Sequence, residues 1–105
     1  MLSISNLTSI MDKQFNGKEI SPADLESKLR AVNSALEIYN DSNLSIRFSF
    51  GEPIDDEKSL DDWKEIECLE LKKIPADRQN MKYTLYEVWY DDEDGFIEAM
   101  LYLNA

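Results

Sequence analysis

The last quarter of the chain, residues 82–105, constrains the fold more than any other stretch. Two runs rich in β-branched and aromatic residues flank the segment 91–95, which is acidic up to its final glycine. Glycine permits the positive φ that a tight turn requires, so this pattern predicts a β-hairpin with a charged tip. Both predicted strands are apolar on both faces, which is typical of strands at the centre of a sheet or at an interface.

Strict alternation along the first strand of this hairpin predicts which side chains share a face. Glu87 is the one acidic residue among the apolar residues of that strand. We expect it to form a salt bridge with Arg47 or Lys82 on a neighbouring strand, with a raised pKa as the alternative. The two predicted faces are Tyr83, Leu85 and Trp89 on one side and Tyr86, Val88 and Tyr90 on the other.

Two helices are predicted upstream of the strands. Apolar residues recur at helical spacing over residues 5–15 and again over residues 22–39. The second segment has a strong start signal, because Ser21 can cap the helix, Pro22 suits its first position and Asp24 can close a capping box. Each helix has one apolar face, which we expect to pack on a sheet.

The clearest period-two pattern in the chain lies at residues 44–50 and predicts a strand with one face buried against the helix of residues 22–39. Residues 52–62 are strongly acidic and are predicted to form an exposed loop. In residues 63–74 the apolar alternation slips once, which a bulged strand or a helix-to-strand switch would explain, and we predict a strand. The apolar face of the first strand consists of Leu44, Ile46, Phe48 and Phe50.

These elements predict a single α+β domain over residues 1–105. Its two N-terminal helices would pack on one face of a four-stranded antiparallel β-meander. The only cysteine is Cys68, so no intramolecular disulfide can form. The N-terminal residues lack the basic and apolar regions of a signal peptide, and no apolar run is long enough to span a membrane. We therefore expect a cytoplasmic location.

The chain carries 22 acidic and 11 basic residues, for a net charge of −11. Residues 52–67 hold eight acids and two lysines, and residues 87–98 hold six acids and no base, so each segment has a net charge of −6. This balance disfavours direct binding to nucleic acid or to an anionic membrane, because phosphates would be repelled. If the strands on either side of residues 75–81 pair, the two acidic segments would converge at one end or edge of the sheet.

Three interpretations of the acidic segments compete: a docking patch for a basic protein, a solubilising surface, and a metal site. The aromatic residues interleaved with the acids favour docking, because tight interfaces combine aromatic anchors with charged surroundings. The spacing of residues 92–95 resembles part of an EF-hand loop, but Tyr90 and Leu101 fall where ligands are needed, so we expect no metal. The candidate partner-binding residues are Asp55, Asp56, Asp61, Asp62, Trp63, Tyr86, Trp89, Tyr90, Asp91, Asp92 and Asp94.

The sequence contains no histidine and no phosphate-binding glycine loop, so we expect neither an enzyme nor a cofactor. The favoured function is a small acidic protein-binding module. Such an inhibitor or immunity-type protein would neutralise a basic partner, such as a nuclease toxin, by occupying its surface. One alternative is a nucleic-acid mimic that inhibits a DNA-binding enzyme, in the manner of phage anti-defence proteins. A second alternative is a housekeeping homo-oligomer, such as a homodimer, with no inhibitory role.

Overall fold

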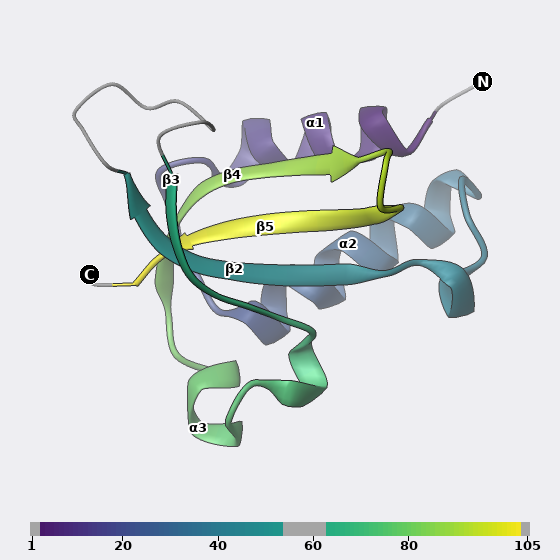
Figure 1. Cartoon of the computed structure of the whole chain (residues 1–105). Coiled ribbons are helices and arrows are strands. Elements are labelled where there is room, and N and C mark those ends of the chain that lie inside the picture. The colour runs from purple at the N-terminus through teal and green to yellow at the C-terminus, as the bar shows by residue number, and fades with distance from the viewer. Residues whose placement is uncertain (1–2, 54–62, 104–105) are drawn as a thin grey trace.

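The computed structural model describes residues 3–53 and 63–103, with the backbone alone for residues 41, 53 and 63–66. The chain has an α+β fold in which helices cover one face of a five-stranded mixed sheet (Figure 1). The elements in chain order are α1 (Ile4–Phe15), β1 (Glu19–Ile20), α2 (Pro22–Leu36), the 3-10 turn η1 (Asp41–Asn43), β2 (Ile46–Pro53), β3 (Trp63–Leu69), the 3-10 turn η3 (Leu71–Lys73), α3 (Ala76–Gln79), β4 (Tyr83–Asp91) and β5 (Phe96–Tyr102).

The N-cap and the first-turn proline predicted for α2 are confirmed. Ser21 is the N-cap, its hydroxyl accepts a hydrogen bond from the backbone N–H of Asp24 at 3.2 Å, and a proline occupies the first turn. The helix ends three residues before the predicted boundary, because Glu37 adopts a left-handed conformation with φ of 53°. The buried amide of Asn33 then donates to the carbonyl oxygen of Tyr39 at 2.8 Å, which fixes the chain as it leaves the helix.

The predicted four-stranded antiparallel meander is wrong. The strand order is β1-β4-β5-β2-β3, and β2 and β5 pair in parallel from Ile46↔Ile97 to Gly51↔Tyr102. A meander assumes that consecutive strands are neighbours, which holds often but not always. Here the residues after β3 instead cross the sheet, so that β4 and β5 enter on the other side of β2. The acidic β3 takes an edge, and β5, which is apolar on both faces, lies in the centre.

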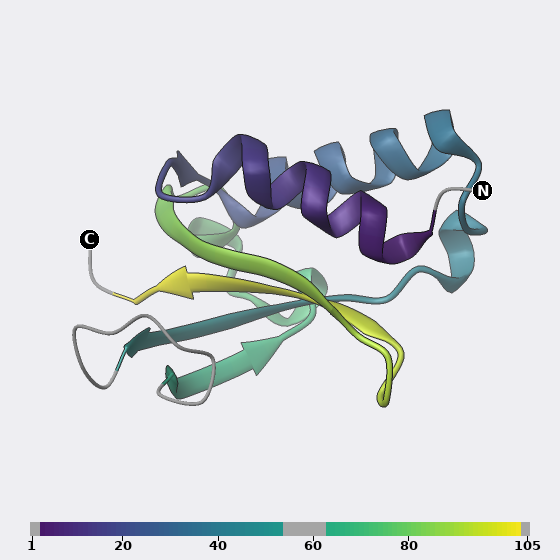
Figure 2. The same ribbon diagram turned by 90° about the horizontal axis from the view of Figure 1, so that it is seen from above.

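The hydrophobic core lies between the sheet and the helices, and Figure 2 shows α1 and α2 on the same side of the sheet. The apolar face predicted for residues 44–50 is confirmed. Leu44, just before β2, and Ile46, Phe48 and Phe50 of β2 are all buried in this core. Residues from both helices and from β4 and β5 complete it, so one side of the sheet is sealed. The fully buried members include Leu7, Met11, Leu25, Leu29, Phe48, Phe50, Leu85, Ile97, Ala99 and Leu101.

The outer edge of β4 is covered by short β1 and by α1. Gly17 donates a backbone hydrogen bond to Leu85 at 2.8 Å, and Leu85 donates back to Lys18 at 2.9 Å. Further along the strand, Asp12 of α1 accepts a hydrogen bond from the backbone N–H of Val88 at 3.0 Å. An edge with unpaired backbone groups invites pairing with other chains, so these contacts protect the sheet.

In the ambiguous segment 63–74 the bulged strand is confirmed and the helix-to-strand switch is wrong: β3 pairs with β2 with a register shift opposite Phe50 and Gly51, and a 3-10 turn comes only after the strand. After it, Arg78 of α3 ties the connection to the sheet. Its guanidinium carbon lies 4.6 Å from the centre of the Phe50 ring, and its Nη1 donates to Glu67 at 3.1 Å. Its Nε also donates to the hydroxyl of Tyr83 at 3.4 Å. This cluster holds β2, β3 and β4 together from the helix side.

The buried face of β2 gives a stability prediction. Phe48 is fully buried in the core, so Phe48→Ala should lower the free energy of unfolding by about 3–5 kcal/mol. Its neighbour Arg47 is exposed on the opposite face, and Arg47→Ala should cost about 1 kcal/mol or less. Urea titration of both variants measures the difference. Equal losses would mean that the face of β2 turned toward the helices is not the core.

Candidate protein-binding face

A bulge in β4 decides which side chains point away from the helices. The pairing register with β5 shifts between Leu85 and Glu87. An extra residue in one strand reverses the alternation beyond it. The predicted faces of this strand are therefore wrong: Val88 and Tyr90 share the helix side with Leu85, and Trp89 points to the other side with Glu87.

The side chains turned away from the helices form what we call the outer sheet face. None of the helices that the structure describes lies on it (Figure 2). Tyr86 and Met100 on this face are buried although they do not belong to the helix-side core. The outer sheet face consists of Tyr86, Glu87 and Trp89 of β4, Phe96, Glu98, Met100 and Tyr102 of β5, and Arg47 and Ser49 of β2.

Ring contacts organise the outer sheet face. The rings of Tyr86 and Tyr102 meet edge to face, with centroids 5.7 Å apart. The guanidinium carbon of Arg47 lies 4.8 Å from the centre of the Phe96 ring. Tyr86, Tyr102 and Glu98 have further interactions within the chain, so these side chains are held in place. The face therefore presents ordered aromatic groups among charged ones.

Glu87 and Trp89 each keep a buried polar atom without a hydrogen-bond partner. These atoms are the Glu87 carboxylate Oε2 and the Trp89 indole Nε1. The two residues are alternate residues of one strand, so their Cα atoms are about 6.7 Å apart. The predicted ion pair of Glu87 with Arg47 or Lys82 is not formed within the described ranges. Burial instead raises the pKa of the Glu87 carboxyl, and the nearby Asp12 carboxylate raises it further.

The hairpin tip presents a second group of acids beside this face. Asp91 Oδ1 accepts hydrogen bonds from the backbone N–H groups of Glu93 at 3.0 Å and Asp94 at 3.1 Å. Gly95 donates to the Asp91 carbonyl oxygen at 2.8 Å and has φ of 74°, as the predicted turn requires. Asp91 thus folds the turn, and the side chains of Asp92, Glu93 and Asp94 are exposed.

The strand pairing that would bring the two acidic segments together is not formed. The condition for convergence is not met, because β3 and β4 are separated by β2 and β5. The hairpin tip lies at the end of the sheet where β2 begins, since Ile97 donates to Ser45 at 2.9 Å. Pro53 and Trp63, which bracket residues 54–62, pair at the other end. Parallel pairing of β2 with β5 therefore places the hairpin tip and the pair of Pro53 and Trp63 at opposite ends of the sheet.

The candidate residues read from the sequence are separated in space. Tyr86 and Trp89 lie on the outer sheet face, whereas Tyr90 packs against the helix-side core. Trp63 begins β3, and its side chain lies outside the described residues. Asp91, Asp92 and Asp94 are at the hairpin tip, and Asp55, Asp56, Asp61 and Asp62 also fall outside the described residues.

Sequence reasoning missed the contribution of β5 to this surface. The alternation of β5 does place Phe96, Met100 and Tyr102 on one face with Glu98. The sequence did not indicate that the bulge in β4 places Trp89 on the outer sheet face as well. Register pairs Trp89 directly with Glu98, and Glu98 with Arg47 on β2.

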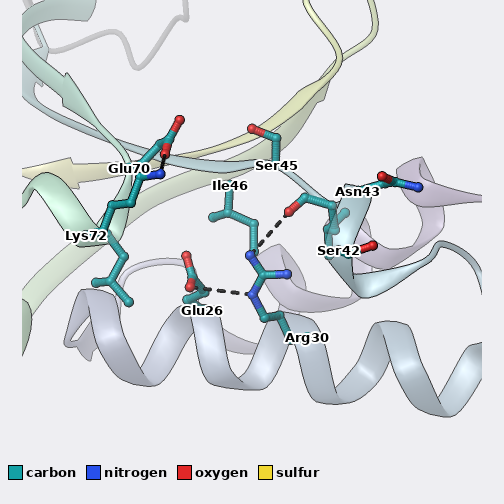
Figure 3. Close-up of a pocket in the computed structure, with 10 residues that line it drawn as sticks. Glu26, Arg30, Ser42, Asn43, Ser45, Ile46, Glu70 and Lys72 are labelled. Carbon is teal, nitrogen blue, oxygen red and sulfur yellow. Dashed lines mark hydrogen bonds and ion pairs between the residues drawn. The ribbon is translucent and has the colours of Figure 1, made fainter.

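A cavity of about 350 Å³ lies between α2 and the start of β2 (Figure 3). Its charged groups are paired with one another. Arg30 contacts Glu26 at 3.5 Å and donates to the carbonyl oxygen of Leu44 at 3.2 Å, and Lys72 contacts Glu70 at 3.4 Å. These bonds link α2 to the chain entering β2, so we assign the cavity a structural role.

The environment of Glu87 makes stability depend on pH. Because its pKa is raised on folding, its contribution becomes unfavourable as pH rises from the unfolded to the folded pKa. Glu87→Gln should therefore be more stable than the parent at pH 7, and the gain should vanish near about pH 3, where the carboxyl is largely protonated in both states. Urea titrations at the two pH values measure this. Glu37→Gln removes the same charge at an exposed position at the end of α2 and serves as the matched control.

No helix in the described ranges is long and apolar enough to cross a membrane. Comparisons with protein-family models, curated proteins and solved structures gave no match. The function of the outer sheet face is therefore argued from its own residues.

Proposed function

We propose that this protein is a small acidic binding module that neutralises a basic partner protein by occupying its surface. Its contact surface would be the outer sheet face together with the hairpin tip. The observation that carries this proposal is the arrangement of ordered aromatic rings and acidic groups on one side of the sheet. An inhibitor or immunity-type protein for a cationic enzyme, such as a nuclease toxin, fits this chemistry. We place its action in the cytoplasm, where a lone Cys68 thiol stays reduced.

The aromatic groups supply the affinity in this proposal. Binding energy at interfaces concentrates in a few tryptophan, tyrosine and arginine residues. Trp89 is partly exposed, and the ring pair of Tyr86 and Tyr102 on the same face is already ordered. Little side-chain entropy would be lost when a partner covers such rings.

The acids supply steering and selectivity. The tip residues Asp92, Glu93 and Asp94 are exposed and have no described basic residue in their own turn. Together with the net charge of −11, they create a field that attracts a cationic surface before contact.

Two other functions are less well supported by the same surface. A nucleic-acid mimic needs rows of carboxylates in place of phosphates. On the outer sheet face, however, Glu87 and Glu98 alternate with rings, and Arg47 adds a positive charge. A homo-oligomer through this face would set the acids of one copy against those of another, which is unfavourable.

The proposal is tested by identifying a partner with matched variants. Parent, Trp89→Ala and Gln14→Ala proteins are used in parallel for capture from cells, followed by calorimetry with the purified partner. We expect a basic partner whose affinity falls by about 2 kcal/mol or more, roughly 30-fold, with Trp89→Ala. Gln14 is exposed on α1, and its variant should bind like the parent.

Circular dichroism confirms that each variant is folded before binding is measured. A partner that is neutral or acidic would contradict the proposal. Unchanged affinity of a folded Trp89→Ala variant would contradict it as well.

The hairpin tip makes a separate kinetic prediction. Changing Asp92→Asn, Glu93→Gln and Asp94→Asn together should slow association about tenfold at low salt and leave dissociation nearly unchanged. Asp91 is kept, because its carboxylate folds the turn. Stopped-flow measurements should show the difference disappearing near about 0.5 M salt, where charges are screened over a few ångström. An association rate of the parent that does not vary with salt would assign these acids to solubility alone.

A further inference from the structure

We propose that the outer sheet face binds one arginine side chain of the partner, held between the Trp89 ring and the Glu87 carboxylate. This inference rests on the proposed function and specifies the contact that anchors the partner. It starts from an arrangement that folding alone leaves incomplete. Buried polar atoms almost always have a hydrogen-bond partner, yet Glu87 Oε2 and Trp89 Nε1, two residues apart on one strand face, have none.

The two atoms call for complementary groups. A carboxylate oxygen only accepts hydrogen bonds, and an indole N–H only donates one. A ligand that satisfies both must carry N–H donors and an acceptor oxygen. An arginine residue has both, in its guanidinium and in its own main-chain carbonyl group.

Charge selects a cation for the Glu87 side. The carboxylate is partly buried, and the Asp12 carboxylate adds negative potential to it. Within the described part of the chain, no lysine or arginine forms an ion pair with Glu87. Arg47 on β2 lies opposite Glu98 in the strand register, and its guanidinium lies over the Phe96 ring. The missing positive charge is therefore left for a partner to supply.

Geometry selects arginine over lysine. A planar guanidinium can lie on an aromatic ring and still donate to a carboxylate at its edge, whereas an ammonium group cannot stack. Elsewhere in this chain an arginine contacts both a ring and a carboxylate. Arg78 lies over the Phe50 ring at 4.6 Å and donates to Glu67 at 3.1 Å. The pair of Trp89 and Glu87 offers the ring and the carboxylate of such a site without its arginine.

The test uses N-acetyl-arginine amide as the probe and follows the indole N–H signal of Trp89 by NMR. The signal is assigned with a Trp89→Phe variant. We expect a saturable shift with a dissociation constant on the order of 1–10 mM, as suits a single-residue ligand. N-acetyl-citrulline amide has the same shape without the charge, and N-acetyl-lysine amide has the charge without the plane. Both should bind at least fivefold more weakly.

Matched variants decide which groups act. Glu87→Gln should abolish the preference for arginine over citrulline, because the carboxylate is lost and the side-chain length is kept. Glu37→Gln removes the same charge from the exposed end of α2 and should leave the titration unchanged. Equal binding of arginine and citrulline derivatives, or an unchanged titration in Glu87→Gln, would overturn the arginine site.

This outcome is separable from that of the proposed function. If the purified partner loses affinity with Trp89→Ala but the arginine derivative does not bind, the docking face stands and the arginine anchor is wrong. If the derivative binds as described but the partner binds Trp89→Ala with the affinity of the parent, the arginine site stands and the neutralising function is wrong.

Discussion

The parallel pairing of β2 with β5 is the contact on which the arrangement of this protein depends. It joins β2, near the middle of the chain, to the last strand, and it places Phe48 beside Ala99 in the core. Because the two strands run in the same direction, the acidic hairpin tip before β5 lies at the start of β2. The connection that follows β2 leaves at the opposite end of the sheet. This one pairing brings core residues of β2 and β5 together, fixes the position of the hairpin tip and places Arg47 opposite Glu98 on the outer sheet face.

The protection of the β4 edge and the candidate binding face share one residue. The β4 bulge sends Trp89 and Glu87 to the outer sheet face, and the bond from Val88 to Asp12 holds the strand directly after the bulge. The same Asp12 carboxylate raises the pKa of Glu87. A neutral residue at position 12 could relieve that repulsion, but it would leave the strand edge without a charged acceptor. The strained electrostatics of Glu87 therefore accompany the way in which α1 covers the sheet.

Local chemistry made much of the fold predictable. The cap at Ser21, the alternation around Phe48 and the turn at Gly95 each act over a few residues, and each is found where the sequence indicated. The strand order was not predictable in this way, because period-two patterns identify a buried face but not the neighbouring strand. The face of Trp89 was also missed, since a single bulge residue has no distinctive sequence here and reverses every side chain beyond it. The candidate site spans three strands, so its composition depends on both the strand order and the face of Trp89, and neither could be predicted.

Glu67 and Glu87 differ in whether a cation pairs with them among the described residues. The carboxylate of Glu67 accepts a hydrogen bond from the guanidinium of Arg78, which also lies over the Phe50 ring. Glu67 and the ring therefore both have a partner within the chain. Glu87 has a ring two residues away and no such cation among the described residues. An unpaired buried carboxylate and an unpaired indole N–H lower the stability of the fold. Departures from local consistency of this kind are expected where a surface is shaped for a ligand. In the same chain the group that pairs with Glu67 is the guanidinium of Arg78, and this is why the cation proposed for Glu87 is an arginine.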